Sequence, residues 1–243
     1  MLKVLLRRCA LALSIVGLAA LPAACDEPPK TGGNQAQKPA GTKPKQIAEK
    51  EKKDGKPADA TKVMVGRVTL AEALSDKVLG KKDAPITILA FESLGCPACA
   101  SFHAKTLPAL KKHYIETGKA KIVFIDFPTN QRAHFAAMLA RCTGNDRFFA
   151  IIEMLFRSQM TWLQSGDFFK DLSRIGRLGG LNETQFKSCM DSKALFETIA
   201  KRQQEASAKH GVRYTPTFVI NGKKLVGAQP FDDFDALMKP MLK

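Results

Sequence analysis

Two cysteines three positions apart, Cys96 and Cys99, stand where the sequence pattern changes from strand to helix. The preceding run, residues 86–91, is continuously β-prone, which is typical of a strand buried on both faces. From Pro97 onward the apolar residues follow helical spacing up to Gly118, and proline suits the first position of a helix. The chain is therefore restricted to folds in which a buried strand carries a cysteine to the start of a helix.

The remaining pattern predicts a second strand, a long helical block and a late return to β-structure. Residues 121–127 form another β-prone run, which completes a strand–helix–strand unit with the usual right-handed crossover. Residues 131–210 show helical periodicity, and the aromatic side chains from Phe148 to Phe169 are predicted to form the core of this block. The alternative is that part of this run lines a groove for unfolded substrates. The predicted helices span residues 131–142, 145–159, 167–177, 183–190 and 193–210. Asn221-Gly222 predicts a hairpin of residues 217–226, and a helix over residues 231–241 closes the chain.

The position of Cys96 indicates a reactive thiol. Disulfide exchange needs a thiolate, and the unpaired N–H groups and positive dipole end of a helix N-terminus stabilise one. Such a site lowers a cysteine pKa from about 8.5 to between roughly 3.5 and 7.5. Cys99 lies one turn further on, close enough to bond to Cys96. The pair is therefore predicted to be catalytic, with Cys96 as the exchanging sulfur.

A cysteine pair of this spacing also occurs in metal sites and structural disulfides. Half of a zinc site or a structural disulfide would look the same, but zinc normally takes four ligands and no second such pair follows. We therefore predict no metal and no cofactor. A copper-handling module that binds through Cys96 and Cys99 stays open as an alternative. His103, one turn after Cys99, is either a residue that tunes a thiolate or a half-buried surface residue.

Residues 1–24 have the composition of a secretory signal peptide. Lys3, Arg7 and Arg8 precede an apolar run, residues 9–21, that is too short to span a bilayer comfortably. We therefore expect export, with the periplasm as the destination.

Cys25 leaves two interpretations of the mature protein open. Cleavage after Ala24 would release a soluble periplasmic protein, whereas lipidation of Cys25 would anchor it to the membrane as a lipoprotein. A lipoprotein site usually has leucine where this chain has Pro22. Lipidation would, however, leave an even number of cysteines for pairing in an oxidising compartment.

Residues 25–62 are predicted to be a flexible linker of low complexity. They are rich in Lys, Pro, Gly, Ala and Gln, and Ile47 is the one large aliphatic residue, so they cannot bury enough surface to fold. The net charge of +15 includes three cations from the signal and a net three from the linker, which leaves +9 for the rest. That part has no basic run interleaved with aromatic residues, so no nucleic-acid binding is expected.

Taken together, Cys96 and Cys99 after the strand, the helical block, and the run from Tyr214 to Gly222 resemble DsbA-like thiol:disulfide oxidoreductases of the thioredoxin superfamily. The similarity covers about residues 79–243. It implies an α/β protein with a thioredoxin fold and an inserted all-helical domain. The thioredoxin-fold domain would comprise residues 63–130 and 211–243, and the inserted domain residues 131–210.

The resemblance also assigns roles to residues away from the cysteine pair. It implies that Pro216 is a cis-proline facing the active disulfide and that the backbone of Thr215 binds the substrate chain. It further implies a structural disulfide between Cys142 and Cys189. Two buried free thiols, or a redox role in exchange with Cys96, are the alternatives for that pair.

Two departures from the family pattern affect what can be carried over. Strongly oxidising members often have a histidine between the cysteines, where this chain has Pro97 and Ala98, so the oxidising strength stays open. The family also tends to place a buried acid six residues before the first cysteine, where this chain has Ala90. Glu92 lies two residues further on, on the same face of the strand, and is a candidate substitute.

We therefore expect a periplasmic thiol–disulfide oxidoreductase that donates a disulfide through Cys96 and Cys99. The resemblance implies reduced exported proteins as substrates and a DsbB-like membrane quinone reductase as the reoxidising partner. A disulfide isomerase or reductase is the enzymatic alternative, because Thr215 before the proline is also found in isomerases. No folded dimerisation domain is expected before Val63.

Overall fold

The computed structural model describes residue 59 and residues 62–242. The predicted signal peptide, Cys25 and nearly all of the predicted linker lie outside these residues. The strands are β1 (Met64–Val65), β2 (Val68–Thr69), β3 (Lys77–Leu79), β4 (Ile86–Glu92), β5 (Ala120–Asp126), β6 (Thr217–Ile220) and β7 (Lys223–Val226). The helices are α1 (Leu70–Ala73), α2 (Pro97–Lys105), α3 (Leu107–Leu110), η1 (Lys111–Ile115), α4 (Gln131–Cys142), α5 (Phe148–Arg157), α6 (Gln159–Leu163), α7 (Phe168–Leu178), α8 (Glu183–Met190), α9 (Lys193–His210), α10 (Phe231–Met238) and η2 (Lys239–Leu242).

Five strands form the main sheet, in the order β3-β5-β4-β6-β7. β4 and β5 are parallel, with Ile86 opposite Ala120 and Glu92 opposite Asp126. β3, β6 and β7 pair antiparallel to their neighbours. The central position of β4 explains its continuous apolar run, because both of its faces are covered.

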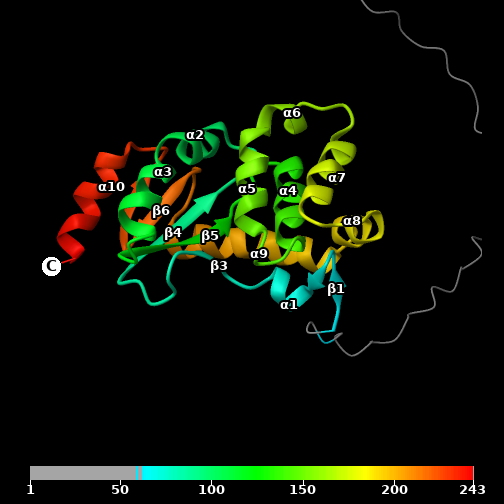
Figure 1. The fold of residues 1–243 in the computed structure, drawn as a ribbon, viewed down its shortest axis with the longest axis horizontal. Coiled ribbons are helices and arrows are strands. Elements are labelled where there is room, and N and C mark those ends of the chain that lie inside the picture. The colour runs from blue at the N-terminus through cyan, green and yellow to red at the C-terminus, as the bar shows by residue number, and fades with distance from the viewer. Residues whose placement is uncertain (1–58, 60–61, 243) are drawn as a thin grey trace, which may run out of the picture. The chain divides into compact units, whose positions relative to one another are not determined.

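Helices cover both faces of this sheet. On one face, Ile86 and Ile88 of β4 share a core with Phe102 of α2 and Phe234 of α10. On the other face, Phe91 packs in a smaller core with residues of β6 and with the C-terminal half of α9. The N-terminal half of α9 packs into the helical block instead, so α9 connects the two parts of the fold (Figure 1).

Helices α4 to α8 gather beside the sheet, between β5 and β6 in the chain (Figure 1). This arrangement confirms the predicted fold class, an α/β thioredoxin fold with a helical insertion. Phe148 and Trp162 are buried in the block as predicted. The prediction was wrong for Phe169, which is 48% exposed, because it follows the buried Phe168 on α7 and therefore points to another face of that helix.

Two predicted helices are divided in the structure. Residues 97–118 form α2, α3 and a π-helical turn, η1, because Pro108 has no N–H with which to continue the ladder from α2. Residues 145–159 were predicted as one helix, but α5 begins only at Phe148. Before it, the Asn145 side chain accepts a hydrogen bond from Lys77 Nζ at 2.5 Å. A separate helix, α6, begins at Gln159.

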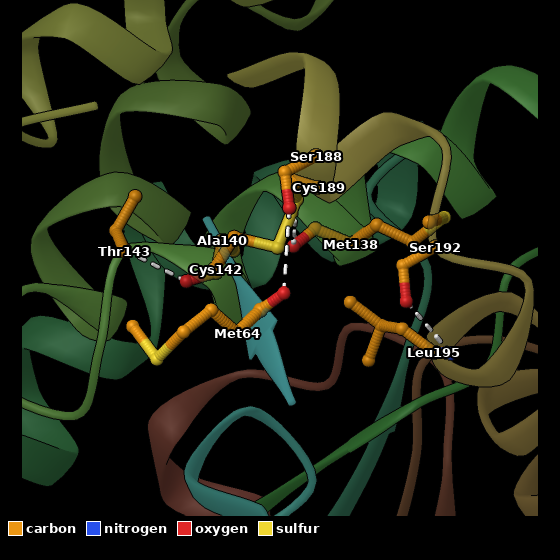
Figure 2. The surroundings of a disulfide bond; sticks show 9 residues. All are labelled: Met64, Met138, Ala140, Cys142, Thr143, Ser188, Cys189, Ser192 and Leu195. Carbon is orange, nitrogen blue, oxygen red and sulfur yellow. Dashed lines mark hydrogen bonds between the residues drawn. A yellow bond between two sulfur atoms is a disulfide. The ribbon is translucent and has the colours of Figure 1, made fainter. Parts of the chain in front are cut away.

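The region before the main sheet carries structure that the sequence pattern did not predict. β1 and β2 form a hairpin whose turn contains Gly66, at a positive φ of 65°. A Cβ atom there would lie 2.6 Å from the Cβ of Cys142, so only glycine lets the hairpin approach so closely. The hairpin thus packs on α4 next to a disulfide that joins Cys142 to Cys189 of α8 (Figure 2).

No helix within residues 62–242 combines the length and apolar character needed to cross a membrane.

Candidate active site

A tight turn at the end of β4 sets the position of Cys96. The Cys96 N–H donates to the carbonyl oxygen of Ser93 at 3.0 Å, and the Ser93 hydroxyl accepts from Gly95 N–H at 3.2 Å. A Cβ atom on Gly95 would lie 2.8 Å from the side-chain nitrogen of Asn130, so glycine allows the turn to pack against the start of α4. Cys96 is the N-cap residue of α2, and Pro97 occupies the first turn, as predicted.

The Cys96 thiol is half-buried, and its pKa is lowered to about 5. The largest cause is the hydrogen bond from the Cys99 thiol, and partial desolvation opposes it. The Thr215 side chain and the backbone N–H groups of Cys99 and Ala98 contribute further hydrogen bonds that lower the pKa. The helix start therefore acts as predicted, but the neighbouring thiol contributes more than the backbone does.

Cys99 has the opposite character. It is fully buried, and its pKa is raised far above the ordinary value for a thiol. Burial is the largest cause, followed by the hydrogen bond to Cys96 and the negative charge of Glu92. Both cysteines are free in this structure, so it represents the reduced pair. The arrangement supplies one readily ionised sulfur and one that holds its proton.

Glu92, whose charge acts on Cys99, forms a buried pair with His103. His103 Nε2 lies 2.9 Å from Glu92 Oε2, and the two side chains are 8% and 1% exposed. The His103 ring also packs against Phe156, with ring centroids 4.2 Å apart. Glu92 thus supplies a buried acid in the strand before the cysteines. The position at which the family usually has this acid holds Ala90 in this chain. His103 is the partner of this acid and not an isolated surface residue.

The loop before β6 brings a residue from the far end of the sequence to Cys96. Cys96 Sγ donates to the carbonyl oxygen of Thr215 at 3.2 Å. The Thr215–Pro216 peptide bond is cis. The loop is held by a hydrogen bond from the Thr217 hydroxyl to the Tyr214 carbonyl oxygen and by another from Gly227 N–H to the Pro216 carbonyl oxygen. Cys96, Cys99 and Thr215 therefore meet at one site, with Pro216 next to them in the chain.

One residue of this site had no signal in the sequence. Gln159, the first residue of α6, is 3% exposed, and its Nε2 donates to the carbonyl oxygens of Leu94 and Cys96 at 2.7 and 3.0 Å. A glutamine more than sixty positions away, in a helical block, shows no pattern that would link it to the cysteine turn.

The other predicted site residues lie elsewhere. Cys142 and Cys189 are buried and joined to each other, with an S–S distance of 2.03 Å. Cys25 lies outside the described residues. Across residues 62–242, no three His, Cys, Asp or Glu side chains gather in a way that could hold a metal ion.

The chain is similar in sequence and in fold to known proteins. The family model described as Thioredoxin matches residues 72–240. A predicted protein-disulfide oxidoreductase of Rickettsia typhi is 32% identical over 157 residues, which are 64% of this chain and 58% of that protein. The chain thus spans less than two thirds of that relative's length. A predicted disulfide bond formation protein D of Bacillus anthracis is 30% identical over 173 residues, or 68% of this chain and 76% of that protein. The crystal structure of Wolbachia pipientis alpha-DsbA1 is similar with a TM-score of 0.64 and 30% identity, covering 69% of this chain and 91% of that one.

Proposed function

The chain belongs to the thioredoxin family, as a DsbA-like member, and on this basis we propose that it is a protein-disulfide oxidoreductase that donates a disulfide to reduced proteins. The observation that carries the proposal is the contrast within the cysteine pair. The pKa of Cys96 is lowered to about 5, while that of the buried Cys99 is raised. A sulfur that is stable as a thiolate makes the reduced pair favourable and the oxidised pair a strong oxidant.

The proposed reaction has two exchange steps. A substrate thiolate attacks Sγ of Cys96 in the oxidised protein; an S–S bond to substrate forms, the Cys96–Cys99 bond breaks, and the electron pair goes to Cys99, which takes up a proton. Glu92, whose charge acts on Cys99 and which pairs with His103, is the ionisable residue through which this proton can reach Cys99. A second substrate thiolate then attacks the substrate sulfur of the mixed disulfide. The substrate disulfide forms and Cys96 leaves as a thiolate.

The difference in pKa between Cys96 and Cys99 favours release of the substrate disulfide over return of the mixed disulfide to the Cys96–Cys99 bond. Cys96 is a good leaving group because its thiolate is stabilised, and Cys99 is a poor competing nucleophile because it stays protonated. The mixed disulfide is therefore resolved by the second substrate thiol and not by Cys99. Overall, two electrons pass from the substrate to the cysteine pair.

Location and partners are part of this proposal. Residues 1–24 support export to the periplasm, because a charged start precedes a short apolar run. We further propose reduced exported proteins as substrates, a DsbB-like membrane quinone reductase as the oxidant that restores the disulfide, and Cys25 as the candidate lipid attachment site. Fractionation of cells that express the full chain, with and without Cys25→Ser, tests the location and the anchor.

The decisive experiment measures the reduction potential of the cysteine pair in glutathione buffers and the oxidation of reduced, unfolded ribonuclease. We expect a potential closer to the value of about −120 mV known for DsbA than to the value of about −270 mV known for thioredoxin. Cys96→Ala and Cys99→Ala should both abolish ribonuclease oxidation. Cys99→Ala alone should still react with a small disulfide, because it keeps Cys96. Its rate should fall off at a higher pH than that of the unaltered protein, because the Cys99 thiol makes the hydrogen bond that lowers the Cys96 pKa most. A thioredoxin-like potential, or full activity without Cys96, would exclude the donor function.

A further inference from the structure

Gln159 is the point at which the helical block holds the cysteine turn. Its amide nitrogen uses both hydrogens, one for the carbonyl oxygen of Leu94 at 2.7 Å and one for that of Cys96 at 3.0 Å. The side chain is almost completely buried. A single group from α6 therefore fixes two carbonyl oxygens of the same turn.

These two oxygens lie in the backbone that carries the reactive sulfur. The Cys96 carbonyl also accepts the first hydrogen bond of α2, from Ala100 N–H at 3.2 Å, so its direction sets the direction of the helix start. Each carbonyl oxygen has a partial negative charge, which disfavours a thiolate nearby. An amide N–H that faces such an oxygen offsets this charge, and the offset is larger in a buried site than in water.

We propose that Gln159 is a positioning residue for disulfide exchange, which holds the Leu94–Cys96 turn in the geometry that favours the Cys96 thiolate. Its hydrogen bonds go to carbonyl oxygens and not to a sulfur, so it acts through the backbone of Cys96. The helical block would then help to set the reduction potential of the Cys96–Cys99 pair, in addition to packing beside the sheet. This inference rests on the proposed function, since redox strength matters only if the pair exchanges disulfides.

The test compares three changes at Gln159 with a matched control. Gln159→Met keeps the length and removes the donors, Gln159→Glu places a carboxylate against the two carbonyl oxygens, and Gln159→Lys keeps a donor. The control is Gln203→Met, because the Gln203 amide also donates to a backbone carbonyl, that of Pro128 at 3.0 Å, which lies outside the Leu94–Cys96 turn. The measurements are the thiolate absorbance of Cys96 at 240 nm against pH, the glutathione equilibrium constant, and thermal unfolding.

For Gln159→Met we expect the Cys96 titration midpoint to rise by at least half a pH unit. The glutathione equilibrium should shift by at least threefold toward the protein disulfide, since a less stable thiolate makes a weaker oxidant. Gln159→Glu should raise the midpoint further, and Gln159→Lys should return it to the original value or below. Gln203→Met should change neither quantity by as much as twofold.

A folded Gln159→Met protein with an unchanged Cys96 titration would overturn the inference. Should that variant fail to fold, equal midpoints for Gln159→Glu and Gln159→Lys would overturn it. The titration needs no substrate, so its outcome is independent of the ribonuclease assay. Loss of the donor function would appear in the unaltered protein as an inability to oxidise ribonuclease, whereas failure of this inference would leave that activity intact.

Discussion

Among single residues, Cys96 and Cys99 show how two identical side chains acquire opposite behaviour within one turn of helix. Cys96 is half-buried and receives hydrogen bonds from the Cys99 thiol and the helix start, which favour its charged form. Cys99 lies inside the fold beside Glu92, and both burial and that charge favour its neutral form. The difference in environment therefore assigns Cys96 as the sulfur that exchanges with substrate and Cys99 as the sulfur that stays protonated.

This ionisation predicts how the stability of the reduced protein depends on pH. The pKa of Cys96 is lower in the folded state than in the unfolded state, so its ionisation stabilises the fold fully above about pH 9 and loses this effect as the pH falls to about 5. Urea unfolding of the reduced protein should thus show a free energy of unfolding that declines from pH 9 to pH 5. Cys96→Ala should lack this component of the decline.

The control for this prediction is the oxidised protein, in which neither sulfur can titrate. For the reduced protein, the free energy of unfolding should fall again above pH 9. The raised pKa of Cys99 means that its thiolate forms more readily in the unfolded chain than in the folded one. An identical pH dependence for the reduced protein and for Cys96→Ala would contradict the low pKa.

The residues of the site differ in how far the sequence could reveal them. Cys96 and Cys99 were predictable because a strand end, a proline and helical spacing surround them. Thr215 and Pro216 followed only from the resemblance to a family, since nothing local shows that they reach Cys96. Gln159 gave no signal, because a side-chain amide that satisfies distant carbonyl oxygens depends on the packing of two separate elements.

At the scale of helices and strands, the disulfide between α4 and α8 is the main covalent link. It joins residues 47 positions apart and lies under the β1–β2 hairpin, where the Ser188 hydroxyl donates to the Met64 carbonyl oxygen at 3.3 Å (Figure 2). The hairpin and α8 are thus held to α4 by one small cluster.

We predict that Cys142→Ala/Cys189→Ala lowers the free energy of unfolding by on the order of 4 kcal/mol, from the loop entropy of a 47-residue separation. The measurement is urea denaturation in a Cys96→Ser/Cys99→Ser background, so that only this disulfide differs. In the background with Cys96 and Cys99 intact, the Cys96 titration should stay near pH 5. A loss below 1 kcal/mol would mean that the unfolded chain is not much restricted by the bond.

Strands and helices were predictable where apolar side chains are buried in a regular pattern. They were not predictable where a polar side chain is buried through hydrogen bonds to a distant residue. β4 and β5 are continuous apolar runs because helices cover both of their faces. β3 begins with Lys77, a residue that seldom starts a buried strand, and it was missed. Its ammonium group is buried because it donates to Asn145 and to the Glu72 carbonyl oxygen at 2.9 Å. α6 was missed because five residues are too few to show helical periodicity.

Across the whole molecule, one buried ion pair connects the helical block to the sheet. Arg141 of α4 donates from Nε to Asp126 Oδ2 at the end of β5, and from Nη1 to the carbonyl oxygens of Ala73 and Ser75 at 2.7 and 3.2 Å. Both charged side chains are almost fully buried. Arg141 is the cation that is hydrogen-bonded to Asp126, and Lys77 and Arg202 also interact electrostatically with this carboxylate.

We predict that Arg141→Met lowers the free energy of unfolding by about 3–5 kcal/mol, because it leaves the Asp126 carboxylate buried without its hydrogen-bonded cation. The double variant Arg141→Met/Asp126→Leu should recover part of this loss, since the uncompensated charge is gone. Arg174→Met serves as the control: Arg174 pairs with Asp171 at 2.8 Å on the surface, and its loss should cost less than about 1 kcal/mol. An equal loss in the free energy of unfolding for Arg141→Met and Arg174→Met would contradict the prediction that the buried Arg141–Asp126 pair matters more than a surface pair.

The hydrogen bond between Cys96 and Thr215 spans 119 positions of the chain, with the entire helical block between them. Ribosomes make proteins from the N-terminus, so both cysteines exist long before the loop that completes their surroundings. A stalled or clipped chain that ends before Tyr214 carries the two sulfurs with part of their setting missing. The complete hydrogen-bond environment of Cys96 therefore forms only after the segment that carries Thr215 has been synthesised.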